Sequence, residues 1–160
     1  MPTPTPSIEL NSTTPPAPAG YRNAVPQSDN GSPLARVTLA MPAIVSVVGV
    51  TIDGGDLTPL TGSKGFVRVL YAGTIKGWTV IADRSGSASF TVKKSTFAAF
   101  PTNSSIVASA PPALSSQQKA SSTTLTGWTT AVAAGDVIEF VLDSVATVHR
   151  LTLELQIERD

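Results

Sequence analysis

The chain has 160 residues, which suits one domain with an extension, and its 11 basic and 11 acidic residues give a formal net charge of zero. Only 14% of the residues are charged, so the sequence lacks the clustered Lys and Arg of a nucleic-acid-binding surface. Because cysteine is absent, disulfides and thiolate metal sites are excluded. Stability must therefore come from burial and from association.

Neither a secretory signal nor a membrane span is predicted. The start, MPTPTPSIEL, lacks the basic region and apolar run of a signal peptide. The most apolar stretch, residues 37–50, is too short to cross a bilayer and contains Pro42. We expect a protein assembled in the cytosol, with neither nucleic acid nor membrane as a partner.

The first 33 residues are predicted to form an extended arm. Proline fixes φ and removes a backbone donor, so this segment is unsuited to a helix or a central strand and has no core of its own. It becomes ordered only by lying on a partner. The predicted anchors in this partner-binding arm are Ile8, Leu10, Tyr21 and Val25. The arm has three charged residues and eight of the 13 prolines: Pro2, Pro4, Pro6, Pro15, Pro16, Pro18, Pro26 and Pro33.

From residue 34 onward, short strand-like segments follow one another at regular intervals. Strands are predicted at 35–41, at 44–52, and at 66–73 with Arg68 facing outward. Two more, at 77–83 and 88–94, are predicted to be joined by a turn at RSGS. Residues 95–100 are predicted to form a short helical turn or an irregular corner.

The second half continues the pattern with four further strand regions. A weak strand is predicted at 106–108 and an edge strand near 120–125, with a serine-rich stretch between them. In residues 136–143 the side chains of Ile138, Phe140 and Leu142 share one face. The clearest alternation is in the last strand, where Leu151, Leu153, Leu155 and Ile157 alternate with polar residues.

Eight or nine short strands without a long amphipathic helix predict an all-β protein. The expected fold of residues 34–160 is an antiparallel two-sheet β-sandwich, jelly-roll-like, preceded by the Pro-rich arm at 1–33.

Few residues suggest chemistry. His149 is the single histidine, and no Gly-x-Ser-x-Gly accompanies it, so it is interpreted as a residue capping the entry to the last strand. Asp53, Asp56 and Asp83 carry possible oxygen ligands, but their spacing is that of turns and not of a calcium loop. Catalytic residues, metal sites and cofactors are not expected.

The two tryptophans lie in similar segments, TIKGWT around Trp78 and TLTGWT around Trp128. Exposed aromatic side chains on a β-sandwich can stack on sugar rings, so the pair is a possible ligand platform. The alternative is that both segments are matched joints, each turning the chain into a hairpin and burying its tryptophan. Burial is favoured, because the chain has few other aromatic residues for its core.

Four segments resemble a domain found in structural proteins of tailed bacteriophages and prophages. They are STTPPAPAGYRNAVPQSD at 12–29, GTIKGWTVIADRSGSASFTVKK at 73–94, the stretch 100–145 that includes LTGWTT and AGDVIEF, and HRLTLELQI at 149–157. The resemblance covers most of the chain. It implies a virion β-sandwich, usually oligomeric, with no enzymatic activity in these motifs.

Three functions follow as hypotheses. In the first, the chain decorates or cements a capsid, binds the major capsid protein or other virion proteins, and forms a homo-oligomer, preferably a trimer. In the second, it belongs to a tail as a fibre-tip or baseplate component that contacts host-surface glycans. The third, a free-standing carbohydrate-binding module, is weakest, because a signal sequence and a catalytic partner are both lacking. Location in the virion is expected in the first two cases.

Overall fold

The computed structural model describes residues 21–24, 37–40 and 42–160, with side chains from residue 42 onward. Its chain divides into two compact units, residues 1–42 and 43–160. In the first unit, β1 (Tyr21–Ala24) pairs antiparallel with β2 (Val37–Ala40), so that Tyr21 lies opposite Ala40. The strand predicted at 35–41 is thus confirmed over Val37–Ala40. The predicted boundary at residue 33 falls outside the described residues.

The second unit is one antiparallel sheet. Its longer strands are β3 (Val45–Asp53), β4 (Gly62–Arg68), β5 (Gly73–Ser95), β7 (Ala113–Ser122), β9 (Val137–Ala146) and β10 (Arg150–Arg159). Two short strands, β6 (Ser104–Ser105) and β8 (Ala131–Val132), also pair with β5. The described residues contain no helix, so none of them forms a helix that could cross a membrane. The all-β prediction is confirmed.

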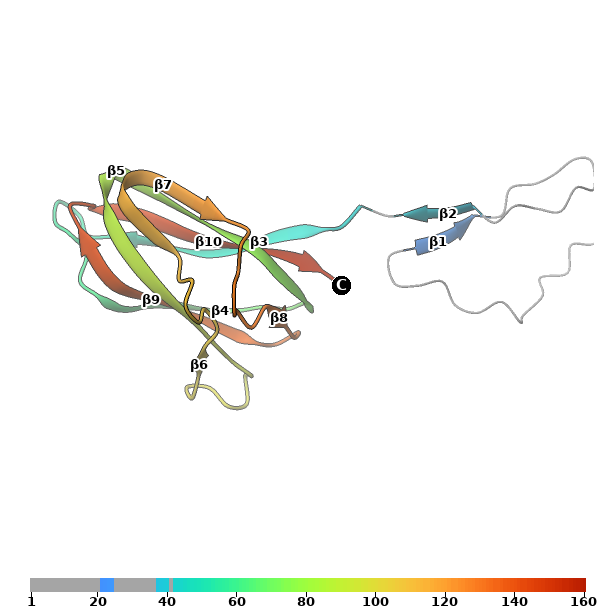
Figure 1. Cartoon of the computed structure of the whole chain (residues 1–160). Helices are drawn as coiled ribbons and strands as arrows, with labels where there is room; N and C mark the ends of the chain where they lie inside the picture. Colours follow the sequence, from blue (N-terminus) through green and yellow to red (C-terminus); the bar gives the residue numbers. More distant parts are fainter. Residues whose placement is uncertain (1–20, 25–36, 41) are drawn as a thin grey trace, which may run out of the picture. The chain divides into compact units, whose positions relative to one another are not determined.

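The sheet curls because β5 serves two sets of neighbours along its 23 residues (Figure 1). Its first half pairs with β10, where Leu151 lies opposite Ala82, and its second half pairs with β9, where Val92 lies opposite Phe140. The strand order is β3-β10-β5-β9-β4. The two end strands, β3 and β4, approach each other without forming a ladder.

The turn predicted at RSGS is wrong, because β5 continues through these residues. Neighbouring groups support the strand there: the amide of Gln118 donates to the carbonyl oxygen of Asp83 at 3.0 Å, and the hydroxyl of Ser87 accepts from the N–H of Ser116 at 3.1 Å. Gly86 lies so close to the backbone oxygen of Ala146 that a side chain would not fit. The polar and glycine residues here lie within the curved strand β5 and do not reverse the chain.

The core lies on the concave side of the curled sheet, and the last two strands contribute to it as predicted. Side chains of Ile138, Phe140 and Leu142 on β9 are fully buried. The four aliphatic residues of β10 face the same interior. A register slip of β10 by one residue would exchange these aliphatics for its polar residues, which fixes the pairing.

Two other predicted elements shift along the chain. The edge strand expected near 120–125 is β7, which begins at Ala113, and the weak strand at 106–108 is replaced by β6 just before it. Ile106 and Val107 are instead buried beside the sheet. The segment 96–101, between β5 and β6, is a series of turns, in agreement with an irregular corner.

Candidate interaction surface

The two tryptophans are buried, each with 8% of its surface exposed. Trp78 lies inside β5, between Leu155 of β10 and Ser122 of β7. Trp128 lies in the turn after β7, where its indole N–H donates to the carbonyl oxygen of Ala110 at 2.9 Å. The expected burial is confirmed, and the tryptophans do not form an open platform for a sugar ring.

The hypothesis of two matched joints is wrong. Gly77, before Trp78, is an internal residue of β5, whereas Gly127, before Trp128, has a φ of 76° in a turn. The same Gly-Trp-Thr sequence therefore occupies a strand in one place and a chain reversal in the other. Tertiary neighbours, and not the tripeptide, decide its conformation.

His149 lies in the turn between β9 and β10, beside a charged cluster at one end of the sheet. One carboxylate oxygen of Asp83 accepts the backbone N–H groups of His149 and Arg150, both at 3.1 Å, and the other accepts from Nε of Arg84 at 2.9 Å. The N–H of Arg150, followed by that of His149 and the side chain of Arg84, lowers the pKa of Asp83 to about 2.

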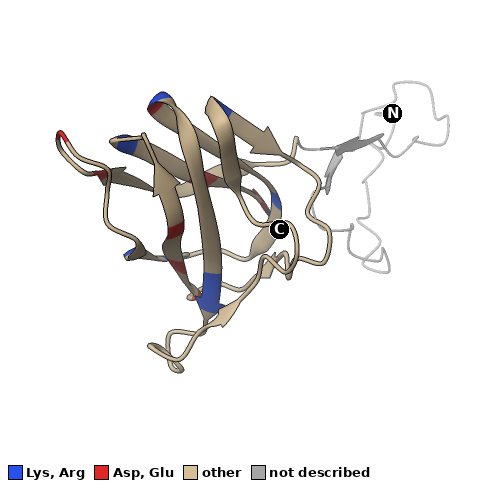
Figure 2. Cartoon of the chain, turned by 60° about the vertical axis from the view of Figure 1, so that its left-hand side comes forward, with Lys and Arg blue, Asp and Glu red and all other residues tan. Residues whose placement is uncertain are grey.

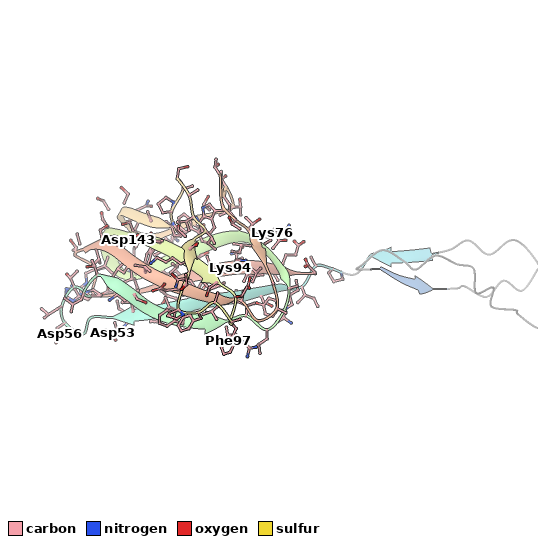
Figure 3. All side chains as sticks on the ribbon, turned by 90° about the horizontal axis from the view of Figure 1, so that it is seen from below. Asp53, Asp56, Lys76, Lys94, Phe97 and Asp143 are labelled. Carbon is pink, nitrogen blue, oxygen red and sulfur yellow. The ribbon has the colours of Figure 1, made fainter. Side chains whose placement is uncertain are left out.

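Asp53 extends this cluster from the end of β3. Its carboxylate accepts the N–H of Gly55 at 2.8 Å and the guanidinium of Arg150 at 2.9 Å. These two contacts, the Gly55 N–H first, lower the pKa of Asp53 below its ordinary value. Figure 3 shows Asp53 and Asp56 at the same end of the sheet.

The charged cluster fastens the turn between β9 and β10 to its neighbours. Within residues 42–160, no group of three or more His, Cys, Asp or Glu side chains is placed to hold a metal ion. Asp53 and Asp83 already accept hydrogen bonds from nearby protein groups, as capping side chains do. The interpretation of His149 as a strand-entry residue agrees with this arrangement.

A different part of the sheet carries an exposed aromatic surface, which we call the phenylalanine face: Phe66, Arg68, Phe97 and Phe100. The three phenylalanines are 52%, 61% and 38% exposed. Phe66 and Phe100 pack edge to face with ring centroids 5.1 Å apart, and the guanidinium of Arg68 lies 4.6 Å from the ring centre of Phe97. Figure 3 shows Phe97 at the margin of the molecule, away from Lys94.

Strand alternation explains why Phe66 is outside. Val67, its neighbour on β4, lies opposite the buried Ile138 and packs against the core. Phe66 lies opposite Glu139 on the outer side of the sheet. Arg68 shares that side, two residues along the strand.

The segment that carries Phe97 and Phe100 is anchored over the outer side of the sheet. Glu139 is only 7% exposed beneath it, and its carboxylate accepts a hydrogen bond from the side-chain amide of Asn103. Nζ of Lys93 lies 3.9 Å from the same carboxylate. A turn closes at Thr102, whose N–H donates to the carbonyl oxygen of Ala99 at 2.9 Å. The aromatic surface is thus held in place before any partner binds.

This surface has little charge to desolvate. Residues 95–105 contain no Lys, Arg, Asp or Glu, and Figure 2 shows the loop below the sheet without a coloured segment. Large exposed apolar side chains gathered in one place are typical of interaction sites. The phenylalanine face is therefore the candidate functional site of the described residues.

The sequence contained one signal for this face, and it was missed. Arg68 was expected to face outward, and the period of two in a strand places Phe66 on the same side. Phe97 and Phe100 give no such signal, because their positions depend on how the segment after β5 folds back. Of the predicted arm anchors, Ile8, Leu10 and Val25 lie outside the described residues, as does the side chain of Tyr21.

Comparisons of the chain with family models, with curated proteins and with solved structures find no match.

Proposed function

We propose that the chain is a structural protein of a tailed-bacteriophage virion, and that it decorates the capsid. The proposed partners are the major capsid protein or other virion proteins, and the location is the virion, assembled in the host cytoplasm. It acts by binding the assembled shell and stabilising it by mass action. The resemblance of its sequence segments to phage structural domains supports the virion assignment.

The observation that carries a binding role is the phenylalanine face. Three large aromatic side chains that remain 38–61% exposed leave apolar area in water that a partner can bury. Mounted on a rigid sheet, they offer a partner apolar area at small entropic cost, because the anchored segment is already ordered. The site suits an apolar surface of another molecule in the particle, which includes a neighbouring copy of this chain.

We interpret the curled sheet as a two-layer sandwich of the jelly-roll type. In this interpretation β5 belongs to both layers, with β3 and β10 in one and β9 and β4 in the other. The arm at residues 1–33 reaches neighbouring molecules, and a trimer is the preferred homo-oligomer.

The alternative is a tail fibre-tip or baseplate component that contacts host glycans. Its candidate platform was Trp78 and Trp128, and burial of both removes the observation that favoured it. In the face found instead, the carboxylate of Glu139 is 7% exposed and already accepts a hydrogen bond from the amide of Asn103, whereas small-ligand sites combine aromatic rings with several polar groups free to bind. Capsid decoration is favoured.

The test is to locate the chain in the particle. Antibodies against residues 43–160 would be used for immunogold electron microscopy of virions purified from the phage or induced prophage that encodes the chain. Labelling over the capsid surface is expected. Labelling confined to the tail supports the alternative, and absence of the chain from virions, checked by mass spectrometry, contradicts both.

A second measurement tests the mode of attachment. Purified full-length chain should sediment with expanded capsids that lack it and should raise the temperature at which they rupture. A chain lacking residues 1–33, shown by circular dichroism to keep its β-sheet, should bind more weakly. Equal binding by the two chains would contradict the role of the arm.

A further inference from the structure

We propose that the phenylalanine face binds the proline-rich N-terminal segment, residues 2–18, of a second copy of this chain. The inference rests on the proposed function, because it specifies how a decoration protein's arm joins neighbouring copies. The observation behind it is that one chain carries both an exposed aromatic surface and a proline-rich segment, two features that bind each other in many peptide-recognition domains.

The chemistry of the segment matches that of the face. Residues 2–18 contain six prolines and a single charged residue, Glu9. Proline-rich chains adopt polyproline II, in which ring faces are presented to the outside and little conformational entropy remains to be lost. Such segments dock on surfaces lined by aromatic side chains. Phe66, Phe97 and Phe100 provide such a surface.

The charges of the two partners are also compatible. The segment's one carboxylate, Glu9, has a cationic counterpart in Arg68, which lies over Phe97. The remaining residues of the segment are uncharged, so docking desolvates few ions. Association therefore depends on apolar contact, with one ion pair that selects its direction.

The dimensions allow the segment to cross the whole face. At about 3.1 Å per residue, a polyproline II stretch of this length spans on the order of 50 Å. The rings of Phe66 and Phe100 are 5.1 Å apart, so only a few residues contact them at once. The two proline clusters, PTPTP at 2–6 and PPAP at 15–18, are therefore alternative contact points within one segment.

A second copy is the occupant because every copy carries one segment and one face. Association of the segment of one copy with the face of the next is head to tail, and such contacts close into a ring when the rotation permits. A cyclic homo-oligomer, such as the proposed trimer, would result without any symmetric patch on the sheet.

Photo-crosslinking of the full-length chain tests the inference. Chain with p-benzoylphenylalanine at position 97 would be mixed with an equal amount of 15N-labelled wild-type chain, irradiated, digested and analysed by mass spectrometry. We expect crosslinks between position 97 and residues 2–18 of the labelled chain. Crosslinks to residues 2–18 only within the same chain, or none to that segment, would overturn the proposal.

The matched control is the same crosslinker at position 57. Leu57 is 74% exposed on the loop between β3 and β4, so it samples an apolar site outside the phenylalanine face. It should not crosslink to residues 2–18. Equal crosslinking from both positions would show that the segment sticks to any apolar site, which contradicts a specific face.

Self-association gives a second measurement that does not depend on the crosslinker. The double substitution Phe97→Ser with Phe100→Ser should raise the dissociation constant of self-association at least tenfold in sedimentation experiments, and Leu57→Ser with Leu60→Ser should leave it unchanged. Circular dichroism checks that the variants remain folded, as expected for exposed positions. An unchanged constant for the phenylalanine variant, or a wild-type chain that stays monomeric, would contradict the inference.

The two proposals fail separately. A chain that is found on capsids but shows no crosslink from position 97 to residues 2–18 contradicts only the inference. A chain that crosslinks as expected but is missing from virions contradicts only the virion function.

Discussion

At the residue scale, Asp83 shows how one carboxylate holds a chain reversal in place. Three donors meet it, from His149, Arg150 and Arg84, and all favour its ionised form. Its pKa of about 2 lies below the ordinary 3.8, so the folded state binds a proton less readily than the unfolded chain. Linkage then requires that this contribution to stability is complete above about pH 4 and is lost as the pH falls toward 2.

The first prediction concerns Asp83→Asn. The variant should have a lower free energy of unfolding than the wild-type chain at pH 7, and the difference should shrink as the pH falls from 4 to 2. Urea denaturation at several pH values measures it. Asp56→Asn is the control, because Asp56 is exposed and has no hydrogen-bond partner among the described residues. A difference that stays constant down to pH 2 would show that ionisation of Asp83 is not involved.

The two tryptophans give a second prediction at this scale, because their polar atoms differ in environment. Trp128→Phe removes the donor to the carbonyl oxygen of Ala110, and should cost about 1–3 kcal/mol because that acceptor loses its partner. No such bond from the indole of Trp78 is found among the described residues, so Trp78→Phe should cost less. Thermal unfolding of both variants measures this. Equal costs would mean that lost packing, and not the hydrogen bond, dominates at Trp128.

At the scale of elements, β5 depends on close contact where it passes from one set of neighbours to the other. A Cβ atom on Gly86 would lie 2.5 Å from the carbonyl oxygen of Ala146 and 2.7 Å from a methyl group of Val148. The carbonyl oxygen of Ala146 belongs to the backbone of a paired strand and cannot move away easily. Glycine is required here for space.

The third prediction is that Gly86→Ala destabilises the protein by about 1–3 kcal/mol, the usual cost of overpacking. Gly65→Ala is the matched control, because its Cβ would meet only one methyl group of the Val50 side chain, at 3.4 Å, and no backbone atom within 4 Å. Chemical denaturation compares the two variants. A cost at Gly65 equal to that at Gly86 would contradict the explanation from close contact.

The sequence predicted the elements that have one buried face better than the elements whose neighbours change. In β10 and β9 the alternation alone identifies Leu153 and Phe140 as interior residues, and both are fully buried. In β5, RSGS has the composition of a turn, and only the groups around Gly86 and Asp83 show why the strand continues. Local composition does not encode these long-range contacts.

The candidate site was less predictable than the fold, for a related reason. Strand alternation predicts that Phe66 faces outward, but Phe97 and Phe100 lie beside it because the segment after β5 folds back, where Asn103 contacts Glu139 of β9. The sequence instead suggested the two tryptophans as a ligand platform. Trp78 is covered by its neighbour β10, and Trp128 by the segment before β7, and neither contact can be read from the local sequence. The two tryptophans were the predicted candidates, whereas three of the five phenylalanines form the exposed surface.

At the scale of the whole molecule, residues 43–160 contain one continuous core. Among the described side chains, the buried hydrophobic residues of this core extend from Val48 on β3 to Ile157 near the end of β10. We therefore expect residues 43–160 to fold on their own.

The fourth prediction follows from that core. A chain comprising residues 43–160 should fold, and its melting temperature should fall by less than about 4 °C, which corresponds to about 1 kcal/mol for a domain of this size. Scanning calorimetry of this chain and of the full-length chain at equal concentration measures the difference. A larger decrease that persists when both chains are diluted would mean that the first unit stabilises the sheet directly, because stabilisation by association between copies weakens on dilution.

The pairing of β3 with β10 determines how the sheet would respond to a pulling force. Val45, at the start of β3, lies opposite Glu158, near the end of β10. Both ends of this unit are therefore at the same end of the β3–β10 ladder. Tension applied between those ends would pull the two strands apart sideways and would break the backbone hydrogen bonds one pair after another. Tension along the strand direction would instead load all the hydrogen-bonded pairs at the same time. The unit would therefore yield at low force when stretched by its ends, although its interior is well packed.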